Sequence, residues 1–147
     1  MNVETRYIDE NKYRELSRFT IQGGDIIVSC RGTIGETFIV PNDAPLGIMH
    51  PSIMKIRIKE SAYNRIFFNS LLQKVLKRHE NEANGSGVKM AITATTLGKE
   101  EFILPPMALQ NQYAHFVEQT DKSKFRIKQS LEKLEILYKA LLQKYFG

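Results

Sequence analysis

The feature that most constrains the fold is a stretch from Met107 to Phe146 that contains neither glycine nor proline. All five prolines and eight of the nine glycines lie before residue 107. Because these two residues are the usual interruptions of a helix, the stretch predicts one continuous helix of about 60 Å at 1.5 Å per residue. The chain is therefore expected to divide into a compact region, residues 1–106, and a helical arm, residues 107–147.

Apolar side chains in the arm recur at alternating steps of four and three residues, the spacing of a coiled-coil seam. Lys124 is the one charged residue on this seam. No helix of similar length is expected elsewhere in the chain, so the seam should pair with a second copy of the chain or dock on another protein. The predicted dimerisation residues are Tyr113, Val117, Ile127, Leu131, Leu134, Tyr138, Leu141 and Tyr145.

Short β-branched runs in the compact region predict strands at 25–30 and 36–40. Between them, Arg31-Gly32-Thr33-Ile34-Gly35 predicts a loop whose backbone N–H groups suit an anion, although a simple turn also explains the two glycines. We expect an α+β fold, with a small mixed sheet and packed helices followed by one long helix of the coiled-coil type.

In the next strand-like run, residues 54–59, apolar residues alternate with cations. Period-2 spacing places the two sets on opposite faces of a sheet. The cation row fits a phosphate backbone, but charged residues also guard solvent-facing edge strands, so both interpretations are open. The apolar set is Met54, Ile56 and Ile58, and the cations are Lys55, Arg57 and Lys59.

An amphipathic helix is predicted from about Ala62 to Glu82, with Ser61 as its N-cap and Asn84-Gly85 as its end. One stripe should face the core and the opposite stripe the solvent. A flexible loop at 84–87, a short helix at 92–97 and a last strand at 101–104 should follow. The apolar stripe is Tyr63, Phe67, Leu71 and Val75, with Ile66, Leu72 and Leu76 beside it, and the polar one is Arg65, Asn69, Gln73 and Lys77, extended by Lys74 and Arg78.

Positive charge is concentrated in residues 55–89, which carry eight Lys or Arg against three Asp or Glu. This excess equals the net charge of the whole chain, +5, and favours nucleic acid as a partner. A solvated face on an assembly module that does not bind DNA is the alternative. The predicted phosphate contacts are Arg31, Lys55, Arg57, Lys59, Lys74 and Lys89, and the predicted base contacts are Thr33, His50, Asn84 and Ser86.

The sequence lacks the patterns of enzymes that modify or cut DNA. Leu104-Pro105-Pro106-Met107 has neither the polar first residue nor the aromatic last residue of the amino-methyltransferase motif. Glu10-Asn11-Lys12 resembles the local triplet of a nuclease metal motif, but it has no preceding acidic partner beyond Asp9 and Glu4. No glycine-rich cofactor loop follows a strand. We therefore expect a non-catalytic chain without a cofactor.

Neither a metal site nor a membrane segment is expected. Cys30 is the single cysteine, and His50, His79 and His115 do not have the spacing of zinc ligands. No apolar run is long enough to span a membrane and the N-terminus has no secretory signal, so the cytoplasm is the expected location.

Three groups of segments follow one another in an order that matches a known family. Gly24–Gly35 contains a strand followed by an Arg-Gly-Thr-x-Gly turn. Gly85-Ser86-Gly87 with Lys89, and then residues 92–97, give a loop and a short helix. The last group is Ile103-Leu104-Pro105-Pro106, Gln110 and Leu131–Leu134. Across residues 7–147, these segments together resemble the specificity (S) subunit of type I restriction-modification systems.

The resemblance implies a target recognition domain that reads a short half-site in double-stranded DNA, joined to a spacer helix that pairs antiparallel with another. Full-length members carry two of each, so two copies of this chain would rebuild the arrangement. It also implies methyltransferase (modification) and restriction subunits as partners, in which catalysis resides. In the family, a further part of the domain precedes the segment matched by Tyr7–Arg18, so the chain is expected to begin inside the domain, and an inactive fragment of such a subunit is an alternative.

Overall fold

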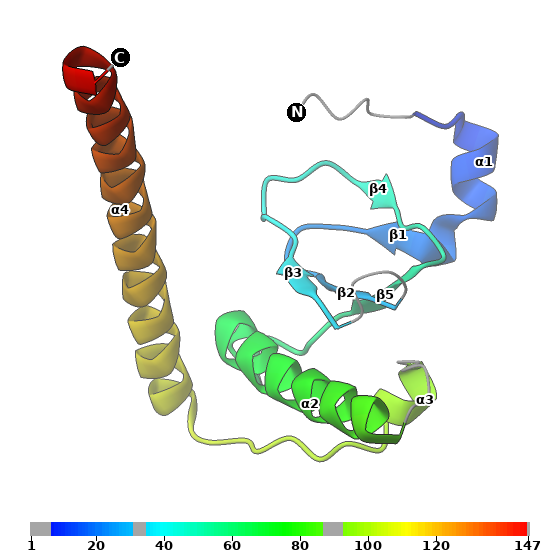
Figure 1. Cartoon of the computed structure of the whole chain (residues 1–147). Helices are drawn as coiled ribbons and strands as arrows, with labels where there is room; N and C mark the ends of the chain where they lie inside the picture. The colour runs from blue at the N-terminus through cyan, green and yellow to red at the C-terminus, as the bar shows by residue number, and fades with distance from the viewer. Residues whose placement is uncertain (1–6, 31–34, 87–92, 147) are drawn as a thin grey trace. The chain divides into compact units, whose positions relative to one another are not determined.

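The computed structural model describes residues 7–30, 35–86 and 93–146. It confirms an α+β chain with a long last helix, and it divides into two compact units, residues 1–105 and 106–147. In chain order, the elements are α1 (Glu10–Glu15), the 3₁₀ helix η1 (Ser17–Phe19), β1 (Thr20–Ile21), β2 (Ile26–Ser29), β3 (Thr37–Ile39), β4 (Gly47–Ile48), β5 (Ile53–Ile56), α2 (Arg65–Ser86), α3 (Ala94–Leu97) and α4 (Met107–Phe146) (Figure 1).

The sheets are small, and all their strands pair antiparallel. β2 is the central strand of a three-stranded sheet with the order β3-β2-β5, and β1 pairs with β4 in a separate sheet. Ile26 of β2 faces Ile39 of β3 on one side and Ile56 of β5 on the other. The three strands predicted before residue 60 are confirmed with shorter bounds. β1 and β4 have two residues each, too few for a sequence pattern to predict.

The core of the first unit lies between one face of the three-stranded sheet and α2. The β1–β4 pair lies on the other side of this sheet (Figure 1). Met54, Ile56 and Ile58 pack against the core, as the period-2 alternation predicts. The fully buried cluster consists of Ile26, Val28, Phe68, Leu72, Leu76 and Leu97.

The start of α2 differs from the prediction. The side-chain oxygen of Asn64 accepts hydrogen bonds from the backbone N–H groups of Ile66 and Phe67, at 2.9 and 3.3 Å. Asn64 is therefore the residue that caps the helix. Ser61, the predicted cap, lies in a turn in which the N–H groups of Ala62 and Tyr63 donate to the carbonyl of Lys59. The Ser61 prediction is wrong because residues 59–63 form this turn and the helix begins only at Arg65.

The end of α2 also differs. The helix continues through Asn84-Gly85 to Ser86, so the loop predicted to begin at residue 84 is wrong for residues 84–86. A single glycine inside a helix costs only about 1 kcal/mol relative to alanine, which does not by itself stop a helix that is stabilised by packing.

The apolar face of α2 is largely the predicted one: Leu72 and Leu76 are buried in the core, Tyr63 and Val75 pack against it, and Phe68 is the core residue that the prediction missed. The row that enters the core is Phe68, Leu72 and Leu76. Gln73 is exposed, as predicted, and its side-chain amide donates to the hydroxyl of Thr37 in β3 at 2.9 Å. The predicted solvent stripe is wrong in part, because Arg65 and Asn69 are half-buried, while Gln73 and Lys77 are exposed.

The segment after α3 is fastened to α2 by the carboxylate of Glu100. A 2.7 Å hydrogen bond joins this carboxylate to Nε2 of His79, and the guanidinium of Arg78 pairs with its other oxygen. The Arg78 guanidinium, followed by His79, lowers the pKa of Glu100 below its ordinary value. The short helix predicted at 92–97 is confirmed as α3, capped by the hydroxyl of Thr93, while residue 92 lies outside the described residues.

The strand predicted at 101–104 is wrong, because these residues have no ladder partner and form no regular secondary structure. Side-chain contacts hold the segment instead. The ring of Phe102 packs against the core with its centroid 5.0 Å from that of Phe68, and the Tyr63 hydroxyl donates to the Phe102 carbonyl at 3.3 Å.

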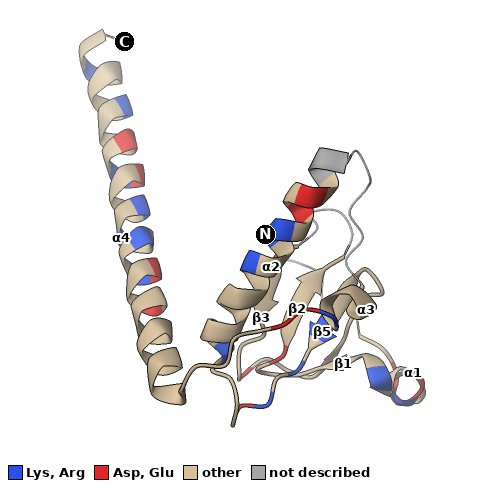
Figure 2. Cartoon of the chain, turned by 90° about the horizontal axis from the view of Figure 1, so that it is seen from below, with Lys and Arg blue, Asp and Glu red and all other residues tan. Residues whose placement is uncertain are grey.

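α4 is one unbroken helix of 40 residues, as the absence of glycine and proline predicts. Lys, Arg, Asp and Glu recur along most of its length (Figure 2). Every residue from 121 to 146 is exposed. From residue 121 onward, the apolar side chains of this helix are therefore exposed to solvent.

Candidate nucleic-acid interface

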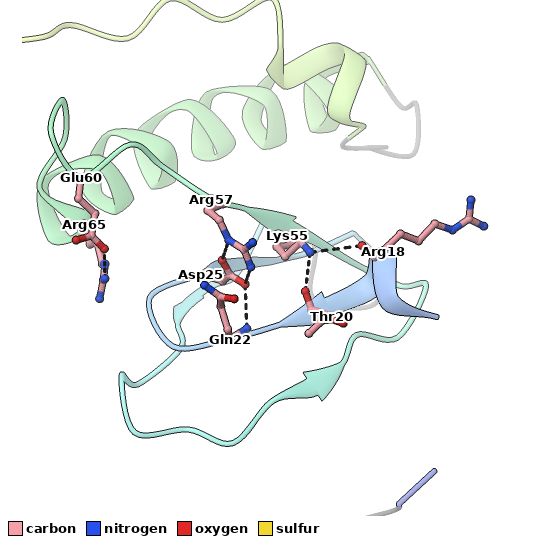
Figure 3. Close-up of polar contacts among 8 residues, drawn as sticks. All are labelled: Arg18, Thr20, Gln22, Asp25, Lys55, Arg57, Glu60 and Arg65. Carbon is pink, nitrogen blue, oxygen red and sulfur yellow. Dashed lines mark hydrogen bonds and ion pairs between the residues drawn. The ribbon is translucent and has the colours of Figure 1, made fainter. Parts of the chain in front are cut away.

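Two cations, Lys55 of β5 and Arg57 directly after it, lie on the sheet face opposite α2 (Figure 3). Lys55 is half-buried there, and its ammonium donates to the backbone carbonyl of Thr20 at 2.6 Å and to that of Arg18 at 3.4 Å (Figure 3). These contacts join β5 to the end of η1 and the start of β1. The ammonium of Lys55 is thus engaged within the unit.

Arg57 points to the same side and is paired with Asp25, the residue that precedes β2. Nε and Nη2 of Arg57 donate to the two carboxylate oxygens of Asp25 at 2.7 and 2.8 Å (Figure 3). The backbone N–H of Gln22 also donates to this carboxylate, at 3.0 Å. Such a fork of two parallel bonds fixes both the distance and the plane of a guanidinium.

The environments of the two partners are very different. Asp25 is 1% exposed, whereas the side chain of Arg57 is 51% exposed. Hydrogen bonding by Arg57 lowers the pKa of Asp25 and outweighs the opposing effect of burial. The same bond raises the pKa of Arg57. The pair is therefore ionised at neutral pH, with the acid inside and one edge of the guanidinium facing water.

Lys59 and Lys74 are exposed, and neither takes part in an ion pair within the described part of the chain. Lys59 follows β5, and Lys74 lies on α2, on the other side of the sheet from Lys55 and Arg57. The structure therefore brings Lys55 and Arg57 together but separates them from Lys74.

His50 lies between β4 and β5 and is exposed. The backbone N–H of Ser52 donates to Nδ1 of His50 at 3.1 Å, and the Ser52 hydroxyl lies 2.7 Å from the same nitrogen. Because Nδ1 is the acceptor, Nε2 carries the proton of the neutral ring and is a hydrogen-bond donor. This donor is of the kind that contacts base edges or phosphates.

The other predicted contacts lie elsewhere or outside the described residues. Asn84 and Ser86 belong to the last turn of α2 and not to a loop. Arg31, Thr33 and Lys89 lie outside the described residues. Sequence reasoning missed Asp25, because an acidic residue beside the Gly23-Gly24 turn is expected to be exposed and its partner Arg57 lies 32 residues away along the chain.

Arg65 is a further cation whose contacts the sequence does not reveal. It donates from Nη1 to the side-chain oxygen of Asn42 at 2.5 Å and pairs with Glu60 (Figure 3). Its contact with Asn42 joins the start of α2 to the loop after β3. Arg65 therefore has a structural role here.

Metal-ligating groups and cavities are the two further features that bear on chemistry. Among the described residues, no group of three or more His, Cys, Asp or Glu is placed to hold a metal ion. A cavity of about 670 Å³ opens beside β2, β3 and α2, where Ser29, Thr37, Gln73 and Lys77 contribute polar groups and Leu76 an apolar one.

The predicted dimerisation residues all lie on α4, and most of their surface is open. Val117 is half-buried, and the other seven are exposed, from 41% for Tyr113 to 69% for Ile127. Leu131 and Leu134, in the middle of the set, are 55% and 61% exposed. Phe125 and Ile136 are exposed as well. These exposures leave a large apolar surface available for another helix.

Comparison with known proteins gives one family. The model of the family described as the type I restriction modification DNA specificity domain matches residues 7–136. The match spans the sheets, α2 and α3 and continues through most of α4. No curated protein matches the chain. In the part of the chain that is described, no helix is both long enough and apolar enough to cross a membrane.

Proposed function

Because the chain belongs to the family of type I restriction-modification DNA specificity domains, we propose that it recognises a half-site in double-stranded DNA without catalysing a reaction itself. The family match over residues 7–136 carries this proposal. Methyltransferase and restriction subunits would supply the chemistry, and this chain would place them on the DNA. The exposed cations of the first unit support the DNA contact, since phosphate contacts dominate affinity for a duplex.

We assign the phosphate contacts first to Lys59 and the open edge of Arg57, and a separate contact, from the α2 side of the sheet, to Lys74. Lys59 and Lys74 are exposed and have no ion pair within the described residues to lose when they approach a phosphate. Arg57 can approach a phosphate while it keeps its ion pair with Asp25. Lys55 would have to give up two hydrogen bonds, so we assign it the role of fastening β1.

For base contacts, we retain His50, whose exposed ring can donate from Nε2. Thr33, Asn84 and Ser86 remain predicted base contacts, and Arg31 and Lys89 remain predicted phosphate contacts. The glycine-rich sequence around each of them is the reason to keep them.

We further propose that α4 pairs with α4 of a second copy of the chain. One copy offers one recognition unit and one long helix, while a split DNA target needs two recognition units. The apolar seam centred on Leu131 and Leu134 supports this pairing, because a heptad seam with both leucines more than half exposed is stable only against another helix.

A salt titration tests the DNA proposal. Fluorescence anisotropy with a short mixed-sequence duplex should give an affinity that falls steeply between about 50 and 200 mM salt. Lys59→Gln and Lys74→Gln should each reduce the slope of log K against log salt by about 0.9. Lys99→Gln, which removes an exposed cation after α3, is the matched control and should leave the slope unchanged. Binding that does not depend on salt, or no binding at low salt, would contradict the proposal.

An assembly module that does not bind DNA is the second candidate. The use of Lys55 and Arg57 in contacts within the unit favours it, because two of the three cations in the predicted row are thereby explained structurally. A chain that forms a dimer and yet fails to bind the duplex at low salt would support this second candidate.

A further inference from the structure

Arg57 has one guanidinium edge bound and one edge open. Nε and Nη2 are bonded to Asp25, whereas Nη1 has no hydrogen-bond partner among the described residues. Nη1 carries two N–H groups. An arginine held in this way presents two donors in a fixed direction, while its inner edge is anchored to a carboxylate that is 1% exposed.

We infer that Asp25 is a positioning residue for DNA binding: it holds the guanidinium of Arg57 so that the Nη1 edge meets a phosphate oxygen. This inference rests on the proposed function and extends it by one residue that does not itself touch DNA.

The physical reason is the freedom that a long side chain loses on binding. A free arginine samples many rotamers and must be ordered when it contacts a phosphate, which weakens the complex. In the unit, the order already exists before DNA arrives, because Asp25 is itself fixed by the Gln22 N–H. The guanidinium plane is thus set by three hydrogen bonds that do not depend on the ligand.

Because Asp25 is negatively charged, its replacement separates two effects on DNA affinity, the positioning of Arg57 and electrostatic attraction. Replacing Asp25 by Asn removes one negative charge and makes the unit more positive. If attraction alone governed the contact, Asp25→Asn would bind DNA more tightly. If positioning governs it, the same variant binds more weakly, because Arg57 keeps its charge but loses its anchor.

The experiment compares Asp25→Asn with Glu10→Gln in the duplex titration. Glu10 pairs with Arg14 on the exposed surface of α1, so its replacement adds the same charge and releases an arginine from a solvent-exposed pair instead of from a buried carboxylate. We expect Asp25→Asn to weaken binding about 2- to 10-fold at constant salt with an unreduced salt slope. Glu10→Gln should bind as the unchanged chain does or slightly more tightly. Asp25→Asn binding equally well or better would overturn the inference.

Arg57→Lys supplies a second variant if Asp25→Asn does not fold. Lysine keeps the charge on an exposed side chain but cannot form the two-bond fork. We expect a similar loss of affinity, and the double variant Asp25→Asn/Arg57→Lys should lose little beyond either single one, since both remove the same coupling. Wild-type affinity in Arg57→Lys would also overturn the inference. Failure of the unchanged chain to bind DNA would instead reject the proposed function.

Discussion

The guanidinium of Arg65 lies directly over the backbone of Gly24. A β-carbon built on Gly24 would lie 2.6 Å from Nη2 and 2.7 Å from Nη1 of Arg65. Gly24 also has a φ of +85°, a conformation that favours glycine. The turn before β2 therefore depends on the absence of a side chain for two separate reasons, one within the backbone and one across to α2.

The first prediction concerns this turn. Gly24→Ala should lower the free energy of unfolding by about 1–3 kcal/mol, from the positive φ and from displacement of Arg65. Urea unfolding followed by circular dichroism measures the change. Gly47→Ala is the control, because a β-carbon there would meet Ile21 at an ordinary 3.6 Å. Equal effects of the two substitutions would contradict the assignment.

The second prediction is a loss of stability in acid that depends on Asp25. Its pKa is lowered in the folded chain, so its contribution is fully present above the unfolded pKa of about 3.9 and disappears as the pH falls through the lower folded value. Asp25→Asn should lower stability at pH 7 by about 1–3 kcal/mol and flatten its dependence below pH 4. Asp43→Asn, at an exposed carboxylate in the loop after β3, should leave the acid limb unchanged.

The third prediction distinguishes two candidate helix caps. Asn64→Ala should cost about 0.5–2 kcal/mol, because it removes the acceptor for two N–H groups at the start of α2. Ser61→Ala should have little effect, and Asn64→Asp should keep most of the stability. Thermal melts of the three variants provide the measurement. A larger loss of stability in Ser61→Ala than in Asn64→Ala would show that Ser61 is the N-cap, as the sequence predicts.

The fourth prediction concerns α4. Leu131→Lys combined with Leu134→Lys should dissociate the proposed dimer, since two charges would enter the seam. Sedimentation velocity at micromolar concentration measures the change in mass. Gln129→Lys adds a lysine to the same turn of the helix away from the seam and should leave the mass unchanged. An oligomer that survives the double substitution would show that the seam lies on another face.

The sequence predicts those parts of the fold that depend on neighbouring residues. The β-branched runs identify β2, β3 and β5, and the absence of glycine and proline identifies α4. The N-cap of α2 is harder, because Ser61 and Asn64 are both good capping residues and only the turn at Lys59 decides between them. The strand expected at 101–104 fails because a strand needs a partner, which a local pattern does not supply.

The candidate site is predictable only as a list of cations. The sequence identifies Lys55, Arg57 and Lys59 as a row, but it does not show which of them are already bonded. The partners of Arg57 and Lys55 lie 32 and 35 residues away along the chain, so no local spacing reveals them. The sequence therefore does not distinguish a cation that is bonded within the unit from a cation that is exposed to water.

Because the seam of α4 is exposed, the measured stability of this chain should depend on protein concentration. When a surface is buried only by association of two chains, the folded population depends on the protein concentration. The melting temperature then rises with that concentration. Single-concentration melts of the full chain would then mix two quantities, the stability of the sheet-containing unit and the association of the helices. A dilution series separates them, because only the second depends on how often two chains meet.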